Sequence, residues 1–335
     1  MNYDHYIGID WSLKMMAVAR MTKYLDKATV FEGPADVKGL KAYLSQLKGT
    51  KIMTIEEGTW SHWLYTELKG SVDRLIICDP TRNALLKEGA KTDKIDAEKL
   101  ARLLRSGHLK EVYHELDEIV YLRQIVSAYE DLILNVIGYK NQKFAILRGY
   151  GCSKKEDLPD DSHELTNFIF NEKADVLELL EEKRKEYEDQ FKLLTKKHPE
   201  IKLLQDVPGF GLINSVKILS RVVDAKRFET KGAFLSYCGL IKLEHSSGGK
   251  IYYRKNGRYC KMMKNVFKTA AMVSIISPKN QFGETYHYLM KVKKYPAYQA
   301  RHAIARIIAT TCFGILKSKK KYKRKEFEKN YSIED

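Results

Sequence analysis

The first third of the chain alternates between short apolar runs and stretches in which apolar residues recur at helical spacing. Short apolar runs are typical of buried strands, whereas recurrence every three or four residues is typical of amphipathic helices. The predicted strands are residues 6–10, 15–20, 28–31, 51–55 and 74–78. The predicted helices are residues 36–47, 60–68 and 92–107. This order predicts a three-layer α/β domain with a mixed sheet over residues 1–113.

Two long helical patterns dominate the middle of the chain, at residues 115–148 and 163–197. The link between them, residues 149–162, is rich in Gly, Ser, Asp and Pro, and the second pattern is dense in Glu and Lys. Such sequences are typical of solvated helical hairpins and coiled coils. We expect a helical coiled-coil spacer over residues 114–200, and the pattern leaves open whether it also mediates dimerisation.

Residues 201–316 are predicted to form a mainly helical domain, so that the expected fold class is α/β plus α. Between two helical patterns lies Pro208-Gly209-Phe210-Gly211, which is the arrangement of a helix-hairpin-helix. In that interpretation the glycines let backbone N–H groups approach a phosphate, although an ordinary tight turn would look the same. Residues 317–335 follow as a basic tail, in which seven of the first nine residues are Lys or Arg.

The charge of the chain changes this picture from a generic fold to one with an expected partner. The 335 residues carry a formal net charge of +16. Polyanions are the natural partners of such a surface, and nucleic acid is the commonest of them. The alternative is a protein whose lysines only solvate its surface, and charge alone favours nucleic acid over it.

The location of the protein is indicated by its cysteines and by its hydropathy. The five cysteines are scattered and form no CxxC pair, which argues against a disulfide framework or a cysteine zinc site and fits a reducing cytoplasm. No apolar run approaches the ~18 residues of a membrane helix, and the first residues do not resemble a signal peptide. We therefore expect a cytoplasmic protein without a membrane partner.

Four carboxylates stand where a metal site could be built. Asp10 ends an apolar strand, Glu56 ends another, and Asp93 and Asp96 lie at the start of a helix. Positions three apart project from nearly one face of a helix, so Asp93 and Asp96 would act together. Two Mg²⁺ ions about 4 Å apart need several carboxylates from separate elements, and Mn²⁺ could replace them. In such a site one ion activates the attacking oxygen and the other stabilises the leaving 3′ oxygen.

Each carboxylate also has a simpler interpretation. Asp93 could be a helix N-cap, with Asp96 stabilised at N3 by the helix dipole. Glu56 could be a surface charge at a strand end, and its neighbour Glu57 could take its place in a site. Asp10 is harder to dismiss, because a buried strand rarely carries an aspartate without a partner. The joint pattern in a basic protein favours the metal site.

The order and spacing of these segments resemble the DEDD signature of the insertion-sequence family numbered one hundred and ten. The segments that carry the resemblance are residues 6–10, 55–56, 91–97, 204–228, 234–240 and 245–249. They cover nearly the whole chain apart from the middle helices. The resemblance implies an RNase-H-like N-terminal domain, similar to the RuvC Holliday-junction resolvase, with Asp10, Glu56, Asp93 and Asp96 as its metal ligands.

The resemblance also implies a serine nucleophile in the C-terminal domain. By position it is Ser247, in the run His245-Ser246-Ser247-Gly248-Gly249, with Ser246 as the runner-up. A serine that attacks a DNA phosphodiester conserves the bond energy in a covalent intermediate. Without the resemblance, a run of this composition would be taken for a flexible loop.

The stretch around this serine is strongly basic. Residues 242–268 hold eight Lys or Arg residues against one acidic residue, with aromatic residues interleaved among them. This is a suitable surface for phosphates and stacked bases, although a basic helix with its aromatic residues in the core would give the same composition. The candidate nucleic-acid contacts are Lys250, Arg254, Lys255, Arg258 and Lys261.

The chain departs from the family pattern at two positions in this domain. The proline usual after the Gly-Leu pair is replaced by Ile241, and a usual arginine is replaced by Met262. Lys261 or Arg258 could supply the missing cation, although Arg and Lys contact phosphates differently. The departures concern the geometry of the serine domain, whereas the carboxylate set is complete.

The resemblance implies DNA transposition or site-specific recombination by a dimer or tetramer on double-stranded DNA. It further implies guidance by a structured bridge RNA encoded in the element. One alternative is a RuvC-like junction nuclease, which would need the four carboxylates but not Ser247. A second is an inactive nucleic-acid-binding relative. A third is an actin-like ATPase, whose first phosphate loop resembles residues 8–12, but it leaves the basic C-terminal half unexplained.

Overall fold

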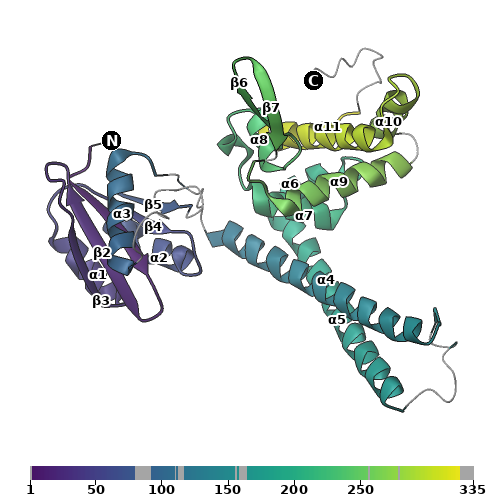
Figure 1. Ribbon diagram of the computed structural model, residues 1–335, viewed down its shortest axis with the longest axis horizontal. Helices are drawn as coiled ribbons and strands as arrows, with labels where there is room; N and C mark the ends of the chain where they lie inside the picture. Colours follow the sequence, from purple (N-terminus) through teal and green to yellow (C-terminus); the bar gives the residue numbers. More distant parts are fainter. Residues whose placement is uncertain are drawn as a thin grey trace. The chain divides into compact units, whose positions relative to one another are not determined.

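The computed structural model describes residues 2–79, 92–109, 111, 117–154, 157, 164–255, 257–277 and 280–324. The chain divides into two compact units, Met1–Leu116 and Asp117–Asp335 (Figure 1). The predicted boundary between residues 113 and 114 lies outside the described residues. Each unit is described by itself.

The described part of the first unit holds a five-stranded mixed sheet in the order β3-β2-β1-β4-β5. Its strands are β1 (His5–Trp11), β2 (Met15–Thr22), β3 (Thr29–Pro34), β4 (Lys51–Glu56) and β5 (Arg74–Cys78). The first three strands are antiparallel neighbours joined by short links, whereas β4 and β5 run parallel to β1 and are reached through helices. The predicted mixed sheet is confirmed.

Helices cover both faces of this sheet. On one face, α1 (Val37–Gln46) and α2 (Ser61–Leu68) pack on alternate strand residues such as Ile7 and Ile9, and a short 3₁₀ turn (Lys69–Ser71) follows α2. On the other face, α3 (Asp93–Ser106) packs on the intervening residues through Ala97 and Ala101. The strand side chains alternate between faces because the side-chain period of a strand is two residues.

Gly8 permits the close contact between β1 and α3. A Cβ atom built on Gly8 would lie 2.3 Å from the Ala97 carbonyl oxygen and 2.5 Å from the Ala101 nitrogen. These are backbone atoms and cannot rotate away, so any side chain at position 8 would push the helix off the sheet. The glycine of the first apolar run therefore positions the helix that carries Asp93 and Asp96.

Ion pairs at the two ends of α3 fix its direction across the sheet. The Lys94 ammonium, in the first turn of α3, lies 2.9 Å from the Glu32 carboxylate of β3. Glu32 pairs with Ala17 of β2, which in turn pairs with Asp10 near the end of β1. Arg105, in its last turn, donates to the Leu25 carbonyl oxygen in the link between β2 and β3. Since that link lies beyond the start of β1, α3 runs antiparallel to β1.

In the second unit, α4 (Asp117–Gly149) and α5 (Glu164–Lys197) form a long helical hairpin (Figure 1). An ion pair of 2.7 Å joins Lys140 to Glu181 along its length. The two long helices confirm the predicted patterns, and the predicted link at residues 149–162 lies partly outside the described residues. At its base, the hairpin shares a buried cluster with the helices that follow, so it is packed into the same unit.

The rest of this unit is mainly helical, as predicted. Its helices are α6 (Pro199–Gln205), α7 (Leu212–Val222), α8 (Lys231–Tyr237), α9 (Lys261–Ile276), α10 (Gln281–Lys291) and α11 (Ala297–Ser318), with a 3₁₀ turn at Ala225–Arg227. They enclose an apolar core around Phe234 and Phe267. The helix α11 continues through Ser318, two residues into the predicted tail, and residues 325–335 of that tail lie outside the described residues.

The Pro-Gly-x-Gly turn between α6 and α7 packs against α9. Gly209 has a φ of +94°, and a Cβ atom there would lie 2.3 Å from the Ala270 carbonyl oxygen. The Ser274 hydroxyl donates to the Pro208 carbonyl oxygen at 2.7 Å. Gly209 thus has a structural role inside the unit, and its predicted approach to a phosphate stays a prediction.

Residues 243–255 form a β-hairpin rather than a helix. Its strands, β6 (Leu243–Ser247) and β7 (Lys250–Lys255), are exposed at every residue. Figure 1 shows the hairpin standing clear of the helices of its unit. A basic helix with buried aromatic residues, one of the two interpretations of this stretch, is therefore wrong for these residues. None of the described helices is both long enough and apolar enough to cross a membrane.

Candidate catalytic site and nucleic-acid interface

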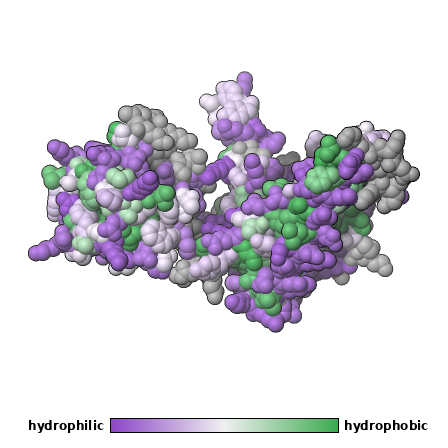
Figure 2. Space-filling view, turned by 90° about the horizontal axis from the view of Figure 1, so that it is seen from below, coloured by the Kyte–Doolittle hydropathy of each residue, from purple (hydrophilic) through white to green (hydrophobic). Residues whose placement is uncertain are grey.

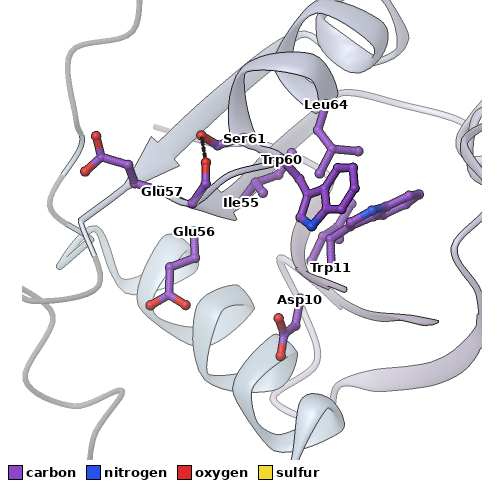
Figure 3. Close-up of a pocket in the computed structure, with 10 residues that line it drawn as sticks. Asp10, Trp11, Ile55, Glu56, Glu57, Trp60, Ser61 and Leu64 are labelled. Carbon is purple, nitrogen blue, oxygen red and sulfur yellow. Dashed lines mark hydrogen bonds between the residues drawn. The ribbon is translucent and has the colours of Figure 1, made fainter. Parts of the chain in front are cut away.

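Asp10 and Glu56 lie side by side at the carboxyl ends of two parallel strands. Ile9 of β1 is in register with Ile55 of β4, so the residues that follow them are neighbours. Both carboxylates belong to the face covered by α3, because the residues before them pack on the opposite face. Figure 3 shows the two side chains pointing to the same side of the strands.

Glu57 lies on the other side of the strand end. Its backbone N–H donates to the Cys78 carbonyl oxygen at 2.9 Å, which continues the pairing of β4 with β5. Its side chain is exposed and points away from Asp10 and Glu56 in Figure 3. Of the two neighbouring glutamates, Glu56 is the one that shares a face with Asp10.

The first turn of α3 brings Asp93 and Asp96 to the carboxyl ends of β1 and β4, here called the carboxylate edge of the sheet. Because α3 runs antiparallel to β1, its N-terminus lies where β1 ends. The helix is capped by Thr92, whose hydroxyl accepts from the Ile95 N–H at 3.3 Å. The alternative in which Asp93 is the N-cap is therefore wrong, and Asp93 and Asp96 both lie within the helix.

Asp96 carries an unusual acceptor for a surface helix. Its Oδ1 atom is buried and has no hydrogen-bond partner, and the Lys99 ammonium lies 3.6 Å from it. A buried carboxylate oxygen without a donor is unfavourable unless a cation offsets its charge. Within the described residues, however, no three acidic, His or Cys side chains come close enough together to hold a metal ion. The site residues thus share an edge and a face without forming a closed ligand set.

The thiol next to these carboxylates is not an additional nucleophile. Burial is the main cause that raises the pKa of Cys78 to about 12, with smaller contributions from the charges of Glu56 and Asp79, while the Thr54 hydroxyl lowers it. The thiol is therefore protonated at neutral pH and does not act as a thiolate ligand. Asp79 is itself buried directly after β5. It is a fifth carboxylate at this edge, which the sequence analysis did not single out.

A small pocket lies beside the carboxylates, with a volume of about 100 Å³. Its lining includes Asp10, Glu56 and Glu57 as well as Trp11 and Trp60, whose indoles lie next to each other in Figure 3. Sequence analysis did not single out the tryptophans. Trp11 directly follows Asp10, and Trp60 follows Glu56 by four residues.

Ser247 stands at the tip of the β6–β7 hairpin. Gly248 and Gly249 form the turn with φ values of +57° and +76°, which is the conformation that Gly-Gly favours in two-residue hairpins. Ser247 is paired with Lys250 across this turn. The apparent flexible loop of the sequence is thus a defined turn that presents the serine to solvent.

The two serines lie on different faces of the hairpin because successive strand residues alternate, and a register shift in β7 sets which residues face each of them. His245 pairs with Tyr253 and Ser246 pairs with Ile251, so one extra residue sits in β7 while β6 alternates regularly. Paired residues share a face. Ser247 therefore lies with Lys250, His245 and Tyr253, whereas Ser246 lies on the opposite face with Ile251. The imidazole of His245 stacks on the Tyr253 ring at 4.4 Å.

The basic candidates on and after the hairpin differ in their surroundings. Arg254 forms an ion pair of 2.6 Å with Glu244, and Lys255 lies 5.8 Å from the centre of the Tyr253 ring. Lys250 is exposed at the turn, and Lys261 begins α9. Arg258 is exposed in the link between β7 and α9. All five lie within residues 250–261, with Lys250 and Lys255 on one face of the hairpin and Arg254 on the other.

A second cationic group lies on α9 and α11, where the sequence analysis named no site. Burial lowers the pKa of His302, and the positive charges of Arg306, Lys268 and Lys264 lower it further, against a hydrogen bond to the Leu240 backbone. Three cations therefore act on one imidazole. The signal in the sequence is that residues 297–324 contain no Asp or Glu.

Two family models match this chain, and both describe transposases. A model of DEDD transposases of IS110 elements matches residues 7–152, which include all four candidate carboxylates. A model described as the transposase IS116/IS110/IS902 family matches residues 201–287, which include the β6–β7 hairpin. Together the matches cover well over half of the chain and leave out the whole of α5 and of α11.

A curated relative gives weaker but independent support. The transposase for insertion sequence element IS1111A of Coxiella burnetii (strain RSA 493 / Nine Mile phase I) is 21% identical over 207 residues. The match covers 58% of this chain and spans 57% of the length of that relative. With both family models placed on the two units in the expected order, the chain belongs to the IS110 family of DEDD transposases.

Proposed function

We propose that this protein is a DNA transposase that excises and inserts a mobile element by cutting and rejoining DNA strands. The observation that carries the proposal is the edge of the sheet at which β1, β4 and the first turn of α3 meet. Asp10, Glu56, Asp93 and Asp96 come from three separate elements and share that edge. The strand order and the antiparallel helix also support an RNase-H-like arrangement for this unit.

In this proposal the four carboxylates hold divalent cations, Mg²⁺ or Mn²⁺. The donor set consists entirely of carboxylate oxygens, which are the ligands that such hard cations prefer. The Asp96 Oδ1 atom is buried without a hydrogen-bond partner, and the Lys99 ammonium 3.6 Å away leaves it able to coordinate a divalent cation. When bound, the cations would supply charge stabilisation to the phosphate and to the oxygens that attack and leave.

Ser247 is the proposed nucleophile. Its hydroxyl oxygen attacks the phosphorus, the 3′ oxygen of the strand leaves with a proton, and the enzyme keeps a phosphoserine bond. Attack by a DNA hydroxyl on that bond then rejoins the strand and returns the serine. The position of Ser247 beside Lys250, on the face that also carries Lys255, supports this role over Ser246, since the phosphate would meet cations there.

The proposal extends to the partners of the enzyme. Double-stranded DNA would contact the basic hairpin, the cationic group on α9 and α11, and the turn at Gly209. A structured bridge RNA would supply sequence recognition, and a dimer or tetramer would bring several cutting sites together. Exposed apolar residues along α4, such as Leu134, Ile137 and Phe144, give the helical hairpin a surface for self-association.

A covalent-trapping experiment tests the chemistry. The full chain is incubated with Mg²⁺ and DNA that carries the ends of its element, and protein–DNA adducts are separated under denaturing conditions. We expect adducts with the natural protein and with Ser246→Ala, and none with Ser247→Ala or Asp10→Asn. A Ser247→Ala protein that still cleaves would instead establish the junction-nuclease alternative, in which water replaces the serine.

The guide is tested by purification of the chain with its nucleic acid retained. Sequencing should then find one discrete RNA that maps beside the gene. Random cellular RNA would contradict the guided mechanism and leave the strand-cleavage proposal in place.

A further inference from the structure

All three tryptophans of the chain gather at one place, beside the proposed catalytic edge. Trp11, Trp60 and Trp63, here called the Trp cluster, touch edge to face, with ring centres 5.9 Å apart for Trp11–Trp63 and 6.2 Å apart for Trp60–Trp63. Trp60 and Trp63 remain 37% and 44% exposed. Indoles usually bury most of their large apolar surface, so an exposed group of them indicates a binding surface.

The position of the cluster determines what could reach it. Trp11 follows Asp10 at the end of β1, and Trp60 precedes α2 after the end of β4. A polymer whose phosphate lies at Asp10 and Glu56 would place its neighbouring groups against these rings. Trp11 and Trp60 line the same pocket as the carboxylates at the strand ends, although Trp11 packs on the face covered by α1 and α2 and Asp10 belongs to the face covered by α3 (Figure 3).

The charge of the pocket limits the chemistry of its occupant. Asp10, Glu56 and Glu57 line it, so a bare phosphate or an acidic peptide would be repelled there. A neutral, flat group suits the indoles, and a nucleobase is such a group already attached to the phosphate chain. Stacking of a base on an aromatic side chain needs its free face, which a paired and stacked base in a duplex does not offer.

We propose that the Trp cluster stacks an unpaired nucleobase next to the phosphate that is cut. This inference rests on the proposed function, since it takes the carboxylate edge as the place of cleavage. It adds a local strand separation at that point, because a base in an intact duplex cannot reach the rings. The cluster would hold the separated base and so position the neighbouring phosphate.

Intrinsic tryptophan fluorescence reports on this cluster alone, because the chain has no other tryptophan. The full chain is titrated, in the presence of Mg²⁺, with single-stranded oligothymidine and with an abasic strand of the same length and charge. Binding of both strands is followed independently by anisotropy of a terminal label. We expect both to bind through their phosphates, and only oligothymidine to quench the tryptophan emission, since a stacked base quenches an indole.

Substitutions at Trp60 sharpen the test. Stacking contributes about 1–3 kcal/mol per base, which corresponds to roughly 5- to 150-fold in affinity. Trp60→Leu should therefore weaken oligothymidine binding by at least about fivefold and leave binding of the abasic strand unchanged. Trp60→Phe keeps an aromatic face and should restore most of the difference.

The outcomes separate the inference from the proposed function. If both strands bind and quench equally, or neither quenches, the stacking inference is wrong and the transposase proposal stands. If neither strand binds, the proposed function fails and the inference fails with it. If emission instead changes with protein concentration in the absence of nucleic acid, the cluster is a contact between copies of the chain, which also overturns the inference.

Discussion

The carboxylates and the serine are held by regions of opposite character. Asp10 and Glu56 end strands whose preceding residues, such as Ile9 and Ile55, are almost completely buried. Ser247 stands on a hairpin in which every residue is exposed. An isolated two-stranded hairpin is at best marginally stable in water, whereas a sheet packed on both faces holds its side chains in place.

This difference indicates how the two regions would share the work. The buried core holds the carboxylates at the strand ends before any DNA binds. Only their final approach to the cations remains to be completed. The hairpin gains a fixed position only from a partner that covers it, and a two-stranded ribbon of this kind fits the major groove of DNA. We therefore expect changes in the first region to alter stability and changes in the second to alter binding.

The largest expected effect is at Gly8, where the first region depends on close packing. Gly8→Ala would place a methyl group against the backbone of α3 and should destabilise the N-terminal unit by roughly 3 kcal/mol. Urea unfolding followed by tryptophan fluorescence reports on this unit. Gly33→Ala in β3 is the matched control, since nothing lies within 4 Å of its Cβ position, and its effect should stay within about 0.5 kcal/mol. Equal effects of the two changes would contradict the packing of α3 on β1.

The cap of α3 provides a smaller and more specific test. Thr92→Ala removes the hydroxyl that accepts from Ile95 and should cost about 1 kcal/mol of helix stability. Because Asp93 and Asp96 lie in that first turn, the Mg²⁺ concentration needed for strand cleavage should rise. Thr230→Ala removes the equivalent cap of α8, where the hydroxyl accepts from Ala233. The Thr230→Ala control should lose a similar amount of stability without a change in the Mg²⁺ concentration needed for cleavage. If both substitutions raise that concentration equally, the first turn of α3 is not part of the metal site.

In the second region the expected changes concern salt dependence rather than stability. Lys250→Gln should lower the slope of log affinity against log salt by about one, as for the loss of one phosphate contact. Arg254→Gln should have a smaller effect, because Glu244 already neutralises that guanidinium at 2.6 Å. Binding to duplex DNA across a salt series distinguishes them. A larger effect of Arg254→Gln would mean that the Arg254–Glu244 pair opens on binding.

The contrast between the regions also explains which features the sequence could predict. Strands such as β1 and β4 were predictable because burial selects continuous apolar runs that end abruptly in polar residues. The helices α3, α4 and α5 were predictable because their apolar residues recur at helical spacing and, in α4 and α5, because the helical pattern is too long for a strand. The β6–β7 hairpin was missed because both of its faces are exposed, so no apolar alternation marks it. Its one usable signal was Gly248-Gly249, a pair that favours hairpin turns.

The sequence could propose the members of the candidate site but not their arrangement. The family resemblance selected Asp10, Glu56, Asp93 and Asp96 as residues. Their meeting at one edge depends on the direction of α3, which ion pairs such as Lys94–Glu32 reveal only in three dimensions. The choice of Glu56 over Glu57 likewise needed the faces of β4. The Trp cluster combines residues from two elements, and sequence spacing alone suggested no shared surface for them.

The smallest expected effect concerns His302, where the cations of α9 and α11 meet. Its pKa is lowered in the folded protein by burial and by neighbouring cations, so the folded state favours the neutral imidazole. The unfolded chain, with a pKa near 6.5, takes up a proton more readily. Stability from this group is thus complete above that value and is lost as the pH falls through and below it. Melting temperatures at about pH 7.5 and about pH 5.5 should differ less in His302→Gln than in the natural protein.

Bound DNA should reduce the same difference in melting temperature, because its phosphates neutralise Lys264, Lys268 and Arg306 and allow the imidazole to accept its proton. A difference that DNA leaves unchanged would separate this cationic group from the DNA-binding surface and leave the hairpin as its centre.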